Sequence, residues 1–185
     1  MRITAAMLAI ISGWYIFQRL TAGNAYASAL QQPTTFLGFD IPDFNRGDTM
    51  PELRYFTAAE FGEWWPLMST DFLTKLDEFR HRLGVPVRIS PATGSLGRES
   101  GLDTSQHNVD MWGEVRAGDV MFIGVDLETA YKVAKEVGFT GIGAYPDWKP
   151  TQGMHLDVRQ APLALWSGIL ESGKQVYKSI QQAFV

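Results

Sequence analysis

The chain has 185 residues, of which 45% are hydrophobic and 19% charged, and this composition is typical of a globular protein with a sizeable core. Its net charge of -4 argues against a nucleic-acid binder, because no cluster of Lys and Arg is dense enough to neutralise phosphates. The absence of cysteine excludes disulfides and thiolate metal sites, so any metal must be held by histidine and carboxylate.

The N-terminal segment contains a charge-free apolar run from Ile3 to Phe17. The run is short for a membrane span, which needs about 20 residues. It has the length of a signal-peptide core, and Ala25-Tyr26-Ala27 then supplies a cleavage site. It can instead form a membrane anchor, if Leu20 to Ala27 extends the helix, or a helix that docks on a partner. We favour the last two, so residues 1–27 are expected to be a hydrophobic helix that binds a membrane or a protein partner through residues 1–20.

A linker is expected over residues 28–52, which are rich in Pro, Gly, Asn and Asp. The folded domain is expected over residues 53–166. Near its start, Thr57 and Glu60 form a capping box, the pattern that begins a helix. Residues 167–185 are predicted to form a separate C-terminal amphipathic helix, because their apolar residues recur at helical spacing.

Within the domain, the apolar periodicity predicts both helices and strands, an α+β pattern. The predicted elements in chain order are a helix from Ser69 or Thr70 to about Leu83, a strand at 85–89, a strand at about 119–123, a helix at 127–137, a strand at 141–145 and a strand at 156–158. The glycines of the strand at 141–145 suggest that another group approaches its backbone closely. His81 lies on the polar side of the first of these helices and is expected to be solvated.

The other two histidines lie in segments typical of a metal site. His107 follows a turn-rich loop, and Asp119 opens an apolar run. His155 lies in an alternating run, on the same face as Asp157 and Arg159. Two imidazoles and a carboxylate are the ligand set of a catalytic zinc site, which keeps one tetrahedral position open for water.

These segments resemble the zinc peptidases that cut peptidoglycan stem peptides, a group that includes D-Ala-D-Ala carboxypeptidases, vancomycin-resistance dipeptidases and phage L-alanyl-D-glutamate endolysins. The usual pattern of the group is Ser-x-His-x-x-Gly-x-Ala-x-Asp with a late histidine. Ser105 and His107 match it directly, and Ala117-Gly118-Asp119 matches Ala-x-Asp. The resemblance covers roughly residues 55–166. It implies a hedgehog/D,D-peptidase-like α+β fold, in which a small antiparallel sheet with flanking helices surrounds a zinc site. The implied zinc ligands are His107, Asp119 and His155.

The spacing of the carboxylate departs from this pattern. The pattern places the aspartate seven positions after the histidine, and here that position is Glu114, whereas Asp119 lies twelve positions after His107. Either an insertion lengthens the loop or Glu114 is the ligand. We prefer Asp119, because it opens a strand and strands place ligands more rigidly than loops. Asp110 is a third candidate, although it fits better as a turn-forming residue.

A peptidase of this kind also needs a carboxylate that takes a proton from water and passes it to the leaving amine. Many members of the resembled family carry it three residues before the second histidine, where this chain has Gln152, which cannot act as a base. Asp147, earlier in the same turn, is the predicted base. Asp157 is predicted to support the site, either by orienting the ring of His155 or as a base acting through water. Arg98 lies in the loop where relatives carry an arginine that polarises the scissile carbonyl or holds the substrate carboxylate.

The sequence therefore predicts a zinc-dependent peptidase that cleaves peptidoglycan stem peptides or cross-links. It is expected to degrade cell wall and to be either extracytoplasmic or associated with a virion. If residues 1–20 bind a membrane, the protein is anchored there. The alternative is a non-catalytic structural or wall-binding protein that keeps the peptidase fold, which Gln152 favours. Trp112 and Trp148 flank the two metal segments and are candidates for the walls of a substrate groove or for core packing.

Overall fold

The computed structural model describes residues 35–36, 39–40, 50–160 and 162–185. The chain divides into two compact units, residues 1–47 and residues 48–185. In the first unit, β1 (Thr35–Phe36) pairs with β2 (Phe39–Asp40) in an antiparallel ladder. The hydrophobic helix expected at residues 1–27 lies outside the described residues. Within the described part of the chain, no helix is both long and apolar enough to cross a membrane.

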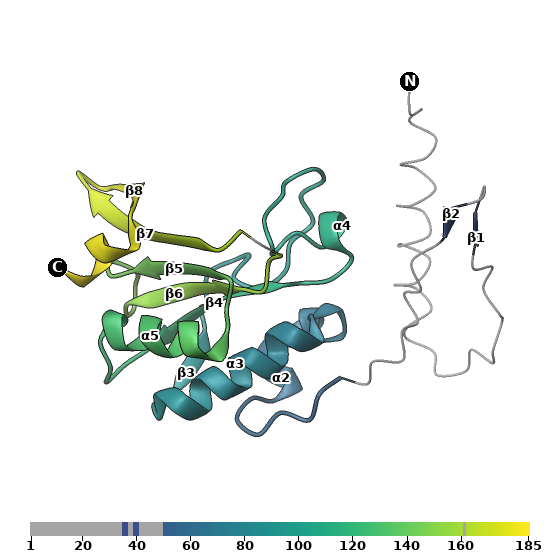
Figure 1. The fold of residues 1–185 in the computed structure, drawn as a ribbon, viewed down its shortest axis with the longest axis horizontal. Coiled ribbons are helices and arrows are strands. Elements are labelled where there is room, and N and C mark those ends of the chain that lie inside the picture. The colour runs from purple at the N-terminus through teal and green to yellow at the C-terminus, as the bar shows by residue number, and fades with distance from the viewer. Residues whose placement is uncertain (1–34, 37–38, 41–49, 161) are drawn as a thin grey trace. The chain divides into compact units, whose positions relative to one another are not determined.

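The second unit is an α+β domain built on a mixed six-stranded sheet with the strand order β3-β4-β6-β5-β7-β8 (Figure 1). Its strands are β3 (Val87–Ile89), β4 (Ala117–Phe122), β5 (Gly141–Tyr145), β6 (Gly153–Asp157), β7 (Ala164–Glu171) and β8 (Lys174–Lys178). The helices are α2 (Ala58–Phe61), α3 (Thr70–Leu83), α4 (Val109–Trp112) and α5 (Leu127–Val137), with 3-10 turns η1 (Gly62–Leu67) and η2 (Ile180–Phe184).

The prediction of an antiparallel sheet is wrong at one ladder, because β5 and β7 run parallel. The strands β5 and β6 form an antiparallel pair, and after β6 the chain crosses β5 and forms β7 along the other edge of β5. The chain reverses its direction twice, once between β5 and β6 and once between β6 and β7, so β7 runs in the same direction as β5. The remaining neighbouring strands of this sheet are antiparallel, as expected.

The helix α2 begins at the predicted capping box, and α3 and α5 begin and end close to their predicted bounds, whereas α4 was not predicted. The carboxylate of Glu60 accepts a hydrogen bond of 2.8 Å from the backbone N–H of Thr57, which completes the capping box of α2. The longest helix, α3, begins after Ser69 and ends at Gly84, whose φ of 68° lies in the left-handed region that glycine adopts without strain. The N-cap of α5 is Asp126, whose carboxylate accepts from the Thr129 N–H at 2.7 Å.

The two long helices, α3 and α5, lie together on one face of the sheet (Figure 1). The strand residues that point to this face are fully buried, and they are Val120, Ile142, Met154 and Leu156. Residues that alternate with them point to the opposite face. That opposite face carries Asp119 and His155, so the alternation of the strands places the candidate site on the side of the sheet away from α3 and α5.

The prediction of an amphipathic helix at residues 167–185 is wrong. This segment forms most of β7, all of β8 and the 3-10 turn η2. The two strands form a hairpin in which Ile169 pairs with Val176. Its turn contains Ser172 and Gly173, with φ values of 51° and 77°. Two central residues with positive φ match the twist of a two-residue hairpin, so the Ser-Gly pair was the local signal for strands.

Candidate metal centre

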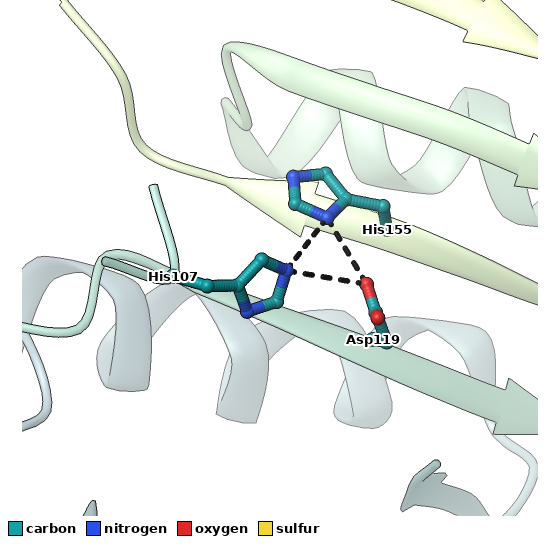
Figure 2. A group of neighbouring side chains, drawn as sticks. All are labelled: His107, Asp119 and His155. Carbon is teal, nitrogen blue, oxygen red and sulfur yellow. Dashed lines mark hydrogen bonds and ion pairs between the residues drawn. The ribbon is translucent and has the colours of Figure 1, made fainter. Parts of the chain in front are cut away.

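Three side chains converge on the face of the sheet that α3 and α5 do not cover, which we call the open face (Figure 2). His107 comes from the loop before α4, and Asp119 on β4 lies directly opposite His155 on β6 in the antiparallel ladder. The Nε2 atom of His107 lies 3.0 Å from Nδ1 of His155. The Oδ1 atom of Asp119 lies 3.0 Å from that Nδ1 and 3.4 Å from the same Nε2. Sheet register therefore fixes two of the three side chains, and the loop supplies the third.

The outward nitrogens of both imidazoles are occupied by acceptors. Nδ1 of His107 donates to the carbonyl oxygen of Leu96. Nε2 of His155 donates to a carboxylate oxygen of Asp157 at 2.9 Å. Each neutral imidazole has one N–H, so the two nitrogens that face each other carry lone pairs. Together with the Asp119 oxygen, three acceptor atoms meet without a donor between them, and this arrangement is costly unless a cation sits among them.

The electrostatics of the site also favour positive charge. Burial raises the pKa of Asp119, but its hydrogen bonds with His107 and His155 outweigh burial and lower that pKa to about 2. Burial lowers the pKa of His155, but the contacts with Asp119 and Asp157 outweigh it and raise that pKa to about 8. In the metal-free protein a proton on His155 thus supplies the charge that the acceptors attract.

The spacing of the three atoms fits a small tetrahedral ion. Zinc bonds to nitrogen and oxygen are about 2.0–2.1 Å long, so two ligand atoms of a tetrahedral site lie about 3.3 Å apart. The distances here are 3.0, 3.0 and 3.4 Å. His107 and His155 are 3% and 8% exposed, and Asp119 is half-buried. The triad can therefore hold a metal ion on three protein ligands.

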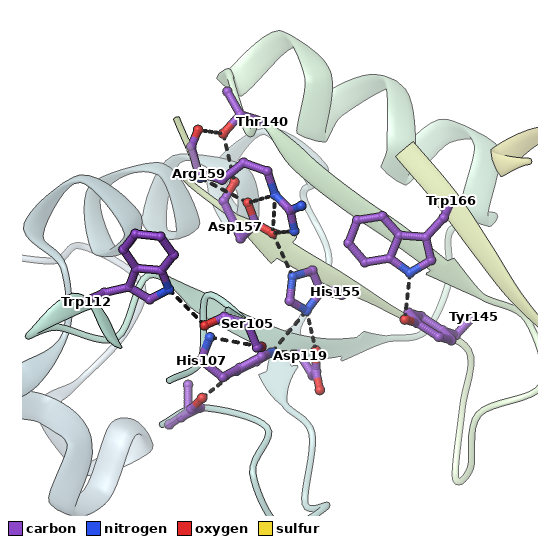
Figure 3. A network of polar contacts seen from close by, with 11 residues as sticks. Ser105, His107, Trp112, Asp119, Thr140, Tyr145, His155, Asp157, Arg159 and Trp166 are labelled. Carbon is purple, nitrogen blue, oxygen red and sulfur yellow. Dashed lines mark hydrogen bonds and ion pairs between the residues drawn. The ribbon is translucent and has the colours of Figure 1, made fainter. Parts of the chain in front are cut away.

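A second layer of side chains holds His155 in place (Figure 3). Asp157 is fully buried and accepts from the Arg159 Nε at 2.9 Å and from the Arg159 backbone N–H at 3.0 Å. Burial raises the pKa of Asp157, but the donors His155 and Arg159 hold it well below its usual range, so this carboxylate stays ionised. A Cβ atom at Gly141 would lie 2.1 Å from the Asp157 carboxylate, so only glycine leaves space for this layer.

Aromatic side chains form a wall beside the site. The ring of Trp166 lies 5.1 Å from that of His155, and its Nε1 donates to the Tyr145 hydroxyl at 2.8 Å. Tyr145 stacks in turn on Trp148, with ring centroids 4.0 Å apart. A Cβ at Gly143 would lie 2.5 Å from Trp166. Sequence reasoning missed Trp166 and Tyr145 as site residues, although the glycines of this strand indicated a close approach.

The connection between β5 and β6 contains Asp147, the predicted base, and Gln152, which stands where the resembled enzymes carry theirs. Both side chains have structural partners. The Asp147 carboxylate accepts from the backbone N–H of Leu170 at 2.8 Å, which links the turn to β7. Gln152 donates through Nε2 to the carbonyl oxygen of Val125 at 2.6 Å. Among the described contacts, neither side chain bonds to the converging triad.

Other candidate side chains also lie in local contacts. The Arg98 guanidinium pairs with Asp103 at 2.8 Å, while its backbone N–H donates to the carbonyl of His107. Glu114 pairs with Arg116 at 2.8 Å, so it is Asp119 that the fold brings to the two histidines.

The remaining residues named from the sequence stabilise loops. Asp110 accepts from the Gly101 N–H at 2.9 Å, a turn-forming role. Trp112 donates through Nε1 to the carbonyl of Ser105 at 2.9 Å and so braces the His107 loop. His81 is exposed on α3, where its Nδ1 lies 2.6 Å from the Tyr55 hydroxyl.

Comparison of this chain with protein-family models, with curated proteins and with solved structures finds no match. The description of the site therefore depends on its own geometry and on the residues of this sequence.

Proposed function

We propose that this chain is a zinc-dependent peptidase that cleaves peptidoglycan stem peptides or cross-links. The observation that supports it most is the group of three acceptor atoms of His107, Asp119 and His155, 3.0–3.4 Å apart, on the open face of the sheet. A structural zinc site uses four protein ligands, whereas a catalytic one uses three and keeps one position open. The order Ser105-x-His107, Ala117-x-Asp119 and His155-x-Asp157-x-Arg159, with its resemblance to stem-peptide peptidases, supports the substrate class.

A zinc ion in such a site activates water and polarises the carbonyl of the scissile peptide bond. The chain's own residues orient this chemistry. Leu96 and Asp157 fix the tautomers of His107 and His155, so that both imidazoles present lone pairs inward. Asp119 adds a negative charge that keeps the ion in place, and Trp166 covers one side of the His155 ring.

The two predicted carboxylates take different roles in this proposal. Asp157 bonds to the outer nitrogen of His155, on the opposite side of the ring from the metal-facing nitrogen, so it positions the ligand and does not face the reacting group. Asp147 stays the predicted base. To act, its carboxylate must leave the Leu170 N–H and turn towards the triad. Arg98 must likewise exchange Asp103 for the substrate before it can polarise a carbonyl.

The proposed setting is cell-wall degradation outside the cytoplasm or by a virion, with residues 1–20 binding a membrane or a protein partner. The second candidate is a wall-binding protein without turnover. Gln152 favours it, because it stands where the resembled enzymes carry the base and instead bonds to Val125.

Mass spectrometry of purified peptidoglycan incubated with the zinc-loaded protein separates these two candidates. The peptidase releases new stem-peptide fragments, and the His155→Ala protein releases none. Retention on the wall with no new fragment from the wild-type protein would support the wall-binding candidate instead.

A further inference from the structure

The open face of the sheet continues beyond the metal triad along β4. Met121 lies two residues after Asp119, so both side chains point to the same face. Met121 pairs across the ladder with Arg88 on the edge strand β3. Two residues of β-strand span about 7 Å and neighbouring strands lie about 5 Å apart, so Arg88 is a near neighbour of the site on its own face.

A cavity of about 340 Å³ lies at this end of the face. It is lined by Pro86, Arg88, Met121, Phe122, Ile123 and Thr151. Because Met121 also pairs with Gly153 on β6, and Thr151 lies two residues before that glycine, the lining residues come from three adjacent segments of the same sheet. The lining is largely apolar, and Arg88 is its one charged side chain.

The charge of Arg88 is unusual within this domain. Residues 50–160 and 162–185 contain seven arginines, and six of them pair with a carboxylate: Arg54, Arg80, Arg82, Arg98, Arg116 and Arg159. The side chain of Arg88 is exposed, and no residue in these ranges forms a hydrogen bond or an ion pair with its guanidinium. A guanidinium binds a carboxylate through two parallel hydrogen bonds, which makes it the side chain best suited to capture one.

We propose that Arg88 and this cavity form an anion subsite that receives a free carboxylate of an extended peptide bound at the metal triad. This inference rests on the proposed function. An extended peptide advances about 3.3–3.4 Å per residue, so the 7 Å between Asp119 and Met121 corresponds to two peptide residues. The peptide carboxylate that Arg88 binds thus lies two residues from the scissile bond. Met121 and Ile123, which also line the cavity, contact the apolar groups of the peptide between these two points.

The test uses the full zinc-loaded chain and a synthetic stem tetrapeptide, together with versions in which one carboxylate at a time is a carboxamide. Binding is measured by calorimetry and hydrolysis by steady-state kinetics. In the wild-type protein, one of the carboxamides should weaken binding roughly tenfold or more, the usual effect of losing a hydrogen bond to a charged group. The Arg88→Gln protein should bind the acid and that carboxamide equally, and Arg88→Lys should recover part of the difference.

The matched control is Arg82→Gln, which removes an exposed arginine on α3, on the other side of the sheet. It should leave the preference for the acid unchanged, and thermal unfolding should show that all variants are folded. An Arg88→Gln protein that discriminates as well as wild type overturns the inference, as does a wild-type protein that binds no stem peptide. Binding that depends on Arg88 without any hydrolysis keeps the subsite and refutes the peptidase. Hydrolysis that is unchanged in the Arg88→Gln protein supports the peptidase and refutes the subsite.

Discussion

The Nε2 atom of His107 and the Nδ1 atom of His155 lie 3.0 Å apart, and neither ring has a proton to place between them once its outer nitrogen has donated. Such a contact between two lone pairs persists in a buried site only if a cation compensates it. The two ways to supply that charge are a proton and a metal ion, and the competition between them can be measured.

The affinity for zinc should fall as the solution becomes more acidic. The pKa of His155 is raised to about 8 in the metal-free protein, mainly by Asp119 and Asp157 acting against burial, and zinc binds only the unprotonated ring. Below about pH 8 zinc must displace a proton, so its apparent affinity should drop about tenfold per pH unit. Asp119 has a pKa of about 2 and stays ionised throughout, so it adds nothing to this slope. Chelator competition at several pH values gives the measurement, and equal affinity at about pH 6 and pH 8.5 would contradict it.

Replacing Asp157 with Asn should weaken zinc binding by about 10- to 100-fold, the usual cost of losing the partner of a ligand histidine. The carboxamide keeps the shape of the side chain but removes the charge that His155 and Arg159 share. Zinc affinity and the visible spectrum of the cobalt-substituted protein report the change. Asp147→Asn is the matched control for this experiment. The Asp147 carboxylate bonds to the Leu170 backbone and not to the triad, so this substitution should leave zinc affinity unchanged.

The Asp147→Asn protein should nevertheless lose most turnover of wall fragments if Asp147 is the base, since an amide cannot accept the proton. The comparison is made between proteins that both hold zinc, so that chemistry is separated from binding. Full activity in Asp147→Asn with none in a zinc-loaded Asp157→Asn protein would reverse the two roles. Full activity in both would place the base elsewhere.

Gly143→Ala should destabilise the domain by about 1–3 kcal/mol, the usual cost of overpacking, because the new methyl group would lie 2.5 Å from the Trp166 indole. In a Trp166→Ala background the same substitution should cost little, since the clashing ring is gone. Denaturant unfolding of the four proteins gives the coupling between the two sites. Equal costs in both backgrounds would show that Gly143 does not serve to seat Trp166.

The local elements of the fold could be predicted from the sequence, and the sheet could not. Caps such as Thr57 and Gly84 act within a few residues, so α2, α3 and α5 followed from them. The parallel pairing of β5 with β7 depends on a connection that leaves β6 and crosses β5, which no local sequence pattern indicates. The C-terminal helix was wrong because apolar residues at helical spacing, Val176 and Ile180 among them, also satisfy a hairpin followed by a 3-10 turn.

The site, like the fold, could be predicted from the sequence only in part. His107, Asp119 and His155 could be named from their residue types, and Asp119 and His155 also from their place on strands. The fold brings the three together. The partners of the other candidates could not be predicted, because Asp147–Leu170 and Gln152–Val125 join segments 23 and 27 residues apart. Trp166 could not be assigned to the site from the sequence, because its place depends on the register of β5 and β7, which sets it opposite Gly143.

The measurement that tests the proposed zinc site most directly is metal analysis of the purified wild-type, His155→Ala and Glu114→Ala proteins after loading with zinc and removal of the excess. We predict one zinc per chain in the wild-type protein, most of it lost in His155→Ala and all of it kept in Glu114→Ala, whose carboxylate pairs with Arg116. Zinc that stays in His155→Ala, or that leaves with Glu114→Ala, would contradict the assignment of His107, Asp119 and His155 as the ligands.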